Sequence, residues 1–195
     1  MIEYRVAKRS DLIQVARIHK EQFKDHYLGQ FSISFLEAFY ENLWVARYVF
    51  IVAEDDGKVL GFVLGGEWGK ISDSLTVFMK KNMFYGMIES FVRPKTWKNS
   101  LQKLFSLLNP RVRDPHNLDN IEKYTLLSIA ICKSSQGKGI GKGLVNEFNN
   151  VMEKFTNRYY LSVQNTNERA IGFYKRMGFV EEHKFNREIQ MIKTL

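Results

Sequence analysis

The sequence has little of what would mark a disulfide-stapled or membrane-spanning chain. Cys132 is the only cysteine among the 195 residues, so no disulfide can form within the chain. It lies in an apolar run, which favours a buried thiol in a reducing compartment over a catalytic nucleophile. No apolar stretch approaches the roughly 20 residues that span a bilayer, and the N-terminus lacks the apolar core of a signal peptide. We therefore expect a soluble, cytoplasmic protein.

Metal-ligand clusters and blocks of like charge are missing as well. None of the four histidines has zinc-site spacing with a thiol or carboxylate, so we expect no metal. The net charge of +8 would suit nucleic acid, an anionic membrane or a phosphorylated ligand, but the basic residues are scattered among acids. Because the sequence has neither an aromatic stacking motif nor a concentrated basic stripe, we expect no specific nucleic-acid partner and no membrane partner.

What the sequence does contain is a regular alternation of strand and helix patterns. The strongest strand signal is "KYTLLSIAIC", a nearly continuous apolar run of the kind buried on both faces of a sheet. The alternation predicts an α/β or α+β sheet domain. The predicted helices are 12–23, 32–45, 140–155 and 168–177, and the predicted strands are 3–8, the hairpin 48–67 with a turn at Gly57, 123–132, 158–165 and two final strands within 179–195.

Residues 68–120 differ in character from the segments around them. Two amphipathic patterns predict helices, 73–90 after a Ser72-Asp73 cap and 96–108 after Pro94. The proline-containing stretch 109–120 predicts a loop. We expect one domain over residues 1–195, with a helical insertion at about 68–120.

One stretch, "SSQGKGIGKGLVNEF" at 134–148, joins a glycine-rich turn to the start of a helix and follows a strand. Unpaired backbone N–H groups and the positive end of the helix dipole meet at such a place, which suits a phosphate. The P-loop pattern fails because Gly143 follows Lys142, and the dinucleotide fingerprint fails because Leu144 or Lys142 stands at its last glycine. The phosphate loop Gln/Arg-x-x-Gly-x-Gly/Ala remains, with an ordinary glycine-rich turn as the alternative.

Gln136, Gly139 and Gly141 meet this remaining pattern, and a second motif follows in "YYLSVQNTNERAIGFYKRMGF". The two motifs in this order resemble the GNAT superfamily of N-acetyltransferases. The resemblance covers about 1–67 and 121–195, and it implies a mixed, mostly antiparallel central sheet flanked by helices, with the insertion between the third and fourth strands. The residues in register with the second motif are Asn167, Ala170, Phe173, Tyr174, Gly178 and Phe179.

The resemblance implies direct transfer of an acetyl group from acetyl-CoA to an amine. Tyr174 would be the general acid for the departing thiolate, with simple packing on a helix face as the alternative. A backbone N–H near Ala130 or Ile131 would polarise the thioester carbonyl. Asn167 would hold the pantetheine or pyrophosphate arm, cap its helix, or do both. The residues expected to bind coenzyme A are Ala130, Ile131, Gln136, Gly137, Lys138, Gly139, Ile140, Gly141, Lys142, Asn167 and Phe173.

The resemblance leaves the general base open. Many members of the family carry a glutamate on the strand before the loop, but "YTLLSIAIC" has no carboxylate. Glu67 and Glu122 are the nearest candidates in sequence, each with a surface charge as the alternative. Deprotonation of the amine through water therefore stays open.

For the acceptor we expect a small-molecule primary amine. The basic residues of the insertion, Arg111 and Arg113 among them, suggest an amino sugar or a nucleotide-linked amino sugar. A protein or peptide acceptor would need an open groove, and an insertion folded over that groove argues against it. A non-catalytic acyl-CoA sensor is a further alternative that Tyr174 disfavours. The insertion could instead provide the face of a homodimer.

Overall fold

The computed structural model describes residues 1–24, 26, 28–46, 48–91 and 124–195, with backbone only for 83–91. The chain divides into two compact units. The sheet unit comprises Met1–Ala7, Tyr48–Trp68 and Glu122–Leu195, and the helical unit comprises Lys8–Arg47 and Gly69–Ile121. None of the helices in the described ranges combines the length and the apolar composition that crossing a bilayer requires.

The sheet unit is built on seven strands in the order β1-β2-β3-β4-β5-β7-β6. Neighbouring strands are antiparallel except for β4 and β5, which are parallel. The predicted mixed, mostly antiparallel sheet is therefore confirmed. The strands are β1 Glu3–Val6, β2 Val49–Asp55, β3 Lys58–Glu67, β4 Tyr124–Ile131, β5 Arg158–Gln164, β6 Val180–Lys184 and β7 Glu188–Thr194.

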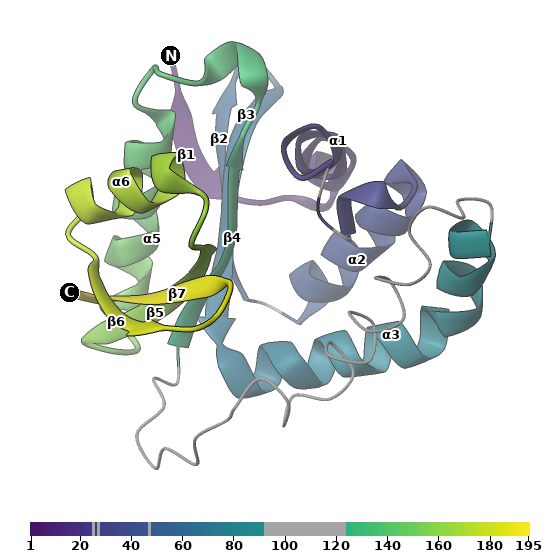
Figure 1. Ribbon diagram of the computed structural model, residues 1–195. Coiled ribbons are helices and arrows are strands. Elements are labelled where there is room, and N and C mark those ends of the chain that lie inside the picture. The colour runs from purple at the N-terminus through teal and green to yellow at the C-terminus, as the bar shows by residue number, and fades with distance from the viewer. Residues whose placement is uncertain (25, 27, 47, 92–123) are drawn as a thin grey trace. The chain divides into compact units, whose positions relative to one another are not determined.

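Two helices, α5 (Ile140–Met152) and α6 (Glu168–Arg176), cover one face of this sheet (Figure 1). Leu144, Val145 and Phe148 of α5 are fully buried. Gly65 on β3 makes room for this helix, because a Cβ there would lie 2.6 Å from Phe148 Cζ. The core of the sheet unit thus lies between α5, α6 and one face of the sheet.

The helical unit contains α1 (Leu12–Gln22), α2 (Ile33–Val45) and most of α3 (Trp68–Phe91). The Ser32 hydroxyl caps α2 by accepting the Phe35 N–H at 3.2 Å. Phe78 of α3 packs its ring edge-on against Phe35 and Phe39 of α2, with ring centroids 5.5 and 5.7 Å apart. Asn42 of α2 also donates to the Ser74 hydroxyl at 2.8 Å. Ser74 and Phe78, both in the first half of α3, therefore make apolar and polar contacts with α2.

Some predicted boundaries are wrong. The chain turns directly from β3 into α3 at Trp68, so Ser72-Asp73 lies inside the helix and does not cap it. The helix predicted for 140–155 ends at Met152. By contrast, the predicted hairpin turn is confirmed, with φ of 50° at Asp56 and 74° at Gly57. The helix and the loop predicted for 96–108 and 109–120 lie outside the described residues.

Candidate active site

The parallel strands β4 and β5 are paired only near their N-terminal ends. Thr125 and Tyr160 form their single registered pair, and the Thr125 hydroxyl donates to the Tyr160 carbonyl oxygen at 3.1 Å. Beyond it, no further pair joins the two strands within 124–195. The C-terminal ends of β4 and β5 therefore border an opening in the hydrogen-bonding of the sheet.

A β-bulge in β4 accompanies this separation. Leu64 and Gly65 are consecutive on β3, yet they pair with Ser128 and Leu126, so β4 has an extra residue between these partners. A bulge bends its own strand and increases the local twist. The bend accounts for the parting of β4 from β5 just after their registered pair.

The backbone of Ile131 faces this opening. Cys132 donates its N–H to the Leu60 carbonyl oxygen of β3 at 2.8 Å, and the N–H groups along an antiparallel strand alternate in direction. The N–H of Ala130 therefore points toward β3, as that of Cys132 does, whereas the N–H of Ile131 points toward β5. Of the two residues expected to supply a donor to a thioester carbonyl, Ile131 is the one whose N–H faces the opening.

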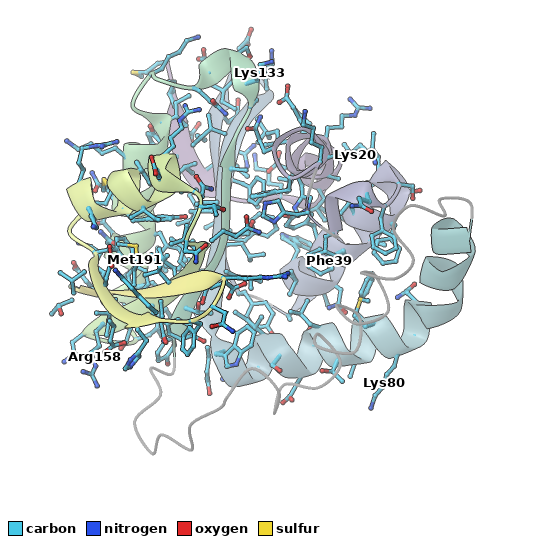
Figure 2. All side chains as sticks on the ribbon, in the orientation of Figure 1. Lys20, Phe39, Lys80, Lys133, Arg158 and Met191 are labelled. Carbon is cyan, nitrogen blue, oxygen red and sulfur yellow. The ribbon has the colours of Figure 1, made fainter. Side chains whose placement is uncertain are left out.

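The glycine loop begins where β4 ends. A 3₁₀ turn, η5 (Lys133–Ser135), leads into it, and Figure 2 labels Lys133 at this end of the sheet unit. Gly137 and Gly139 have φ of 80° and 79°, a conformation that strains any residue with a Cβ. No atom of the described residues lies within 4 Å of the position that a Cβ would take on either glycine. The loop thus presents bare backbone with open space beside it.

Helix α5 starts directly after this loop. Its N-cap is Gly139, and no side chain within the described ranges caps its first N–H groups. These N–H groups and the positive end of the helix dipole form a site suited to an anion. Lys138 and Lys142 are exposed beside it. The strand, glycine turn and helix N-terminus predicted from the sequence are therefore all present.

Gly141 brings β4, the loop and α6 together. A Cβ at Gly141 would lie 3.1 Å from Ile131 Cδ1 and 3.3 Å from Phe173 Cζ, which is closer than ordinary contact. The Gln136 side chain returns to the same place and donates to the Ile131 carbonyl oxygen at 3.4 Å. Four residues expected at one site from separate motifs therefore lie next to one another.

Helix α6 carries the other two predicted functional side chains. The Asn167 side chain caps the helix by accepting the Ala170 N–H at 3.1 Å, so the capping role considered for it is present. Tyr174 is 9% exposed and packs between Phe173 and Phe179. The centroid of the Tyr174 ring lies 5.4 Å from the centroid of each phenylalanine ring. Burial raises the pKa of Tyr174 to about 12, which keeps the phenol protonated at neutral pH.

The Tyr174 hydroxyl remains available to a ligand. No hydrogen bond to this hydroxyl is formed by the described residues, and their only fully buried side-chain nitrogen or oxygen without a partner is Nε2 of His19. The Tyr174 oxygen is therefore not sealed in the core like its ring. Its neighbour Tyr159, by contrast, donates to Asn149 Oδ1 at 2.6 Å and serves the packing of α5 against β5.

The two glutamates considered as bases do not reach the opening in the described structure. Glu67 pairs in register with Tyr124, at the opposite end of β4 from Ile131. Seven residues of strand separate these ends, about 23 Å. Glu67 is therefore excluded as a base acting directly at Ile131. Glu122 lies outside the described residues, as do Arg111 and Arg113.

Some residues around the opening were not singled out from the sequence. One of them is Asn165, which binds the turn between β6 and β7. Polar side chains on one face of β5 and β7 were also missed. Their signal was the alternation of apolar and polar residues in "YYLSVQ" and "EIQMI". Within the described residues, no group of three His, Cys, Asp or Glu side chains could hold a metal ion.

Residues 111–179 match the sequence model of the Acetyltransferase (GNAT) family. A curated relative, described as an N-alpha-acetyltransferase of Sulfurisphaera tokodaii, is 26% identical over 184 residues, which is 92% of this chain and 81% of the relative.

Solved structures of acetyltransferases share the fold. The PaiA N-acetyltransferase from Thermoplasma acidophilum in complex with coenzyme A aligns with a TM-score of 0.61 at 18% identity, over 100% of this chain and 99% of its own. The ribosomal-protein-alanine N-acetyltransferase from Brucella melitensis aligns with a TM-score of 0.60 at 16% identity, over 99% of each chain.

Proposed function

Because this chain carries the acetyltransferase domain of the GNAT family and is an N-acetyltransferase, we propose that it transfers the acetyl group of acetyl-CoA directly to the primary amine of a small molecule. The observation that carries the proposal is that the glycine loop, the uncapped start of α5 and the opening between β4 and β5 lie together at the C-terminal end of β4. An anion site and a backbone donor to a carbonyl oxygen stand at one end of the sheet there. A thioester that carries a pyrophosphate needs both.

The loop would bind the pyrophosphate. The open space beside Gly137 and Gly139 lets phosphate oxygens approach the backbone N–H groups. The dipole of α5 and the exposed Lys138 and Lys142 add favourable charge. In this assignment Gly141 allows Ile131 and Phe173 to approach the loop closely, so that the arm following the pyrophosphate can enter between β4 and β5.

The N–H of Ile131 would polarise the thioester carbonyl. It points into the opening between β4 and β5, where no strand partner takes it. A donor fixed in a strand needs no reorganisation when negative charge grows on the carbonyl oxygen, and one such donor contributes about 3 kcal/mol to lowering a barrier. The amine nitrogen attacks the carbonyl carbon, the C–S bond breaks, and the sulfur leaves as a thiolate.

Tyr174 would serve the departing sulfur. Its hydroxyl has no protein partner among the described residues, and burial keeps it protonated. The attacking amine must lose a proton too, and β4 offers no carboxylate for this. We assign that proton to water in the opening, because Glu67 lies at the wrong end of the strand.

A second acceptor class has a specific observation behind it. The curated relative is described as an N-alpha-acetyltransferase, so the α-amine of a peptide is the alternative to a small-molecule amine. The two classes share the donor site and differ only in what occupies the acceptor side.

Thiol release from acetyl-CoA tests the proposal. The wild-type chain would be assayed against polyamines, amino acids, amino sugars, nucleotide-linked amino sugars and peptides with a free α-amine. We expect amine-dependent release of coenzyme A with one class, which identifies the acceptor. If acetyl-CoA binds but no amine accelerates release, the proposal of amine acetylation is wrong; if acetyl-CoA does not bind, the assignment of the loop is wrong.

A further inference from the structure

On β5 and β7, the face opposite α5 and α6 is polar near the C-terminal end of β5. Cross-strand pairs join Ser162 with Gln190 and Gln164 with Glu188. Ser162 and Gln164 are exposed, while Gln190 and Glu188 are half-buried. We call these four residues the polar wall. The residues between them face the core with α5 and α6 and are apolar: Leu161, Val163, Ile189 and Met191.

The polar wall stands beside the opening between β4 and β5. Gln164 follows Tyr160, the β5 residue paired with β4, by four residues or about 13 Å of strand. Ile131 follows Thr125, the β4 residue of that pair, so Ile131, Gln164 and its partner Glu188 all lie beyond the registered pair, on the part of the sheet where β4 and β5 have separated. Ile131 directs its N–H into the opening there.

The turn between β6 and β7 holds Glu188 in this part of the sheet. Asn165, the residue after β5, donates its N–H to the Arg187 carbonyl oxygen and its Nδ2 to the Asn186 carbonyl oxygen, both at 3.1 Å. The Phe185 N–H donates to the Glu188 carbonyl oxygen at 2.8 Å. These bonds tie the start of β7 to the end of β5, so Glu188 cannot move away from the opening without breaking them.

The Glu188 carboxylate has no counter-charge in the described structure. By contrast, the carboxylate of Glu181 on β6 is paired with Lys175 at 2.7 Å and with Lys184 at 3.0 Å. No ion pair or side-chain hydrogen bond to the Glu188 carboxylate is found among the described residues. Glu188 is a half-buried residue, and a cationic ligand would give its carboxylate the counter-charge that the described residues do not supply.

We propose that Glu188 binds the ammonium group of a cationic acceptor and so selects positively charged amines for acetylation. This inference rests on the proposed function. A primary amine has a pKa near ~10 and reaches the enzyme mostly as an ammonium ion. Held against Glu188, the ammonium group would lie across the opening from the thioester, with Gln164 and Gln190 as neighbouring hydrogen-bonding groups. An amine with a single ammonium group must then pass one proton to water before its nitrogen attacks the carbonyl carbon. Anionic acceptors such as sugar phosphates are disfavoured at this wall.

The test compares Glu188→Gln with Glu182→Gln and the wild type. Glu188→Gln keeps the shape and removes the charge, while Glu182 is an exposed glutamate on β6 and serves as the matched control. Coenzyme A release would be followed with spermidine, glucosamine and an alanine-initiated peptide, at low and high salt. We expect Glu188→Gln to raise the KM of each accepted amine roughly 10- to 100-fold, the effect of losing a hydrogen bond to a charged group. The KM of acetyl-CoA and the melting temperature should stay unchanged.

The dependence of the amine KM on ionic strength distinguishes charge recognition by Glu188 from a purely structural role. In the wild type and in Glu182→Gln, the KM of the amine should rise with ionic strength, and in Glu188→Gln this dependence should be lost. If the wild type turns over an amine and Glu188→Gln leaves its KM unchanged, the role of Glu188 is refuted and the proposed function stands. If the wild type releases no coenzyme A with any of the amines, the proposed function itself fails and takes this inference with it.

Discussion

The phenol of Tyr174 lies between Phe173 and Phe179, and burial raises its pKa to about 12. An alkyl thiol has a pKa near ~8.5, so complete transfer of the phenol proton to a thiolate would be uphill by about 5 kcal/mol. Donation of a hydrogen bond to the sulfur has no such cost. At the scale of this residue, stabilisation of the leaving thiolate by the O–H group is favoured over outright proton transfer.

Tyr174→Phe should therefore lower kcat roughly 100-fold, near the lower limit for acid catalysis. The ring packing is kept, so the KM of acetyl-CoA and the thermal stability should stay close to the wild type. The wild-type kcat should show no loss from ionisation of Tyr174 below pH ~10, because the pKa is raised. Full activity of Tyr174→Phe in steady-state assays would remove this residue from the mechanism.

Burial lowers the pKa of His19 in the helical unit, whereas it raises the pKa of Tyr174. His19 is 6% exposed, its Nδ1 lies 2.6 Å from the Tyr40 hydroxyl, and its Nε2 has no partner among the described residues. Burial, followed by the charges of His26 and Lys20, lowers its pKa to about 4. His19 is therefore neutral in the folded state at every pH well above that value.

This lowered pKa predicts acid sensitivity with a definite sign. Below pH ~6.5 the unfolded chain binds a proton at His19 that the folded chain refuses, so stability falls as the pH drops from about 6.5 to about 4, by roughly 3 kcal/mol in total. Urea unfolding at pH 7 and pH 4.5 would measure this loss. His19→Gln should lose less stability than the wild type over that range, and Tyr40→Phe, which keeps the histidine, should retain the full loss. Equal pH dependence in all three would contradict the assignment.

At the scale of elements, the glycine loop and the β2–β3 turn offer a matched pair of glycines. Gly139 and Gly57 have φ of 79° and 74°. In the part of the chain that the structure describes, no atom lies within 4 Å of the place that a Cβ would take on either glycine. Alanine at either place costs about 1 kcal/mol or more of backbone strain. Only Gly139 belongs to the proposed pyrophosphate loop.

Gly139→Ala should therefore raise the KM of acetyl-CoA about tenfold if the loop relieves its strain by shifting away from the binding geometry. Gly57→Ala introduces the same backbone strain, so it should lower the melting temperature about as much as Gly139→Ala does. It should leave the KM of acetyl-CoA unchanged. Kinetics on both variants would check this. Equal KM values for the two variants would show that the conformation at Gly139 does not matter for the cosubstrate.

A second element-scale feature is the approach of β1 to α5. A Cβ on Gly143, inside α5, would lie 2.1 Å from the Tyr4 ring. Glycine inside a helix makes the helix less stable than alanine would, by about 1 kcal/mol. Here the close approach of the Tyr4 ring, which only glycine allows, offsets that cost. We expect Gly143→Ala to destabilise the wild type but to stabilise a Tyr4→Ala background, and a double-mutant cycle of urea unfolding would measure the coupling. Additive effects would contradict the contact.

Elements with a strong local signal were predictable from the sequence. The apolar run at 124–131 and the left-handed turn at Gly57 depend on neighbouring residues alone, so their patterns carry the structure. The start of α3 at Trp68 was not predictable in this way, because Ser72-Asp73 offers a good cap that the continuing helix overrides. The general shape of the loop was predictable, whereas the direction of the Ile131 N–H was not. That direction depends on the register of β4 with β3 and on a bulge that leaves no mark in the sequence.

At the scale of the whole molecule, the sequence and the local charge say different things about the acceptor. The net charge of +8 would suit a phosphorylated ligand among other partners, although the basic residues are scattered among acids. The sheet unit instead carries Glu188, whose carboxylate has no ion pair among the described residues, opposite Gln164 at the C-terminal end of β5. Net charge averages over the surface, while recognition depends on the groups at the opening. The alternation of apolar and polar residues on β7 already indicated that Glu188 lies on a polar face. Only the pairing of β7 with β5, and of β5 with β4, showed that this face lies near the opening.

The central claim is direct transfer of an acetyl group from acetyl-CoA to an amine nitrogen by the full chain. The most direct measurement is mass spectrometry after incubation with acetyl-CoA deuterated in its acetyl group and with the amine panel. We expect the deuterated acetyl group on the nitrogen of the accepted amine, an equal amount of free coenzyme A, and no acetylated side chain on the enzyme as an intermediate. Intact acetyl-CoA with every amine, or a label that accumulates on the enzyme before it reaches the amine, would contradict the account.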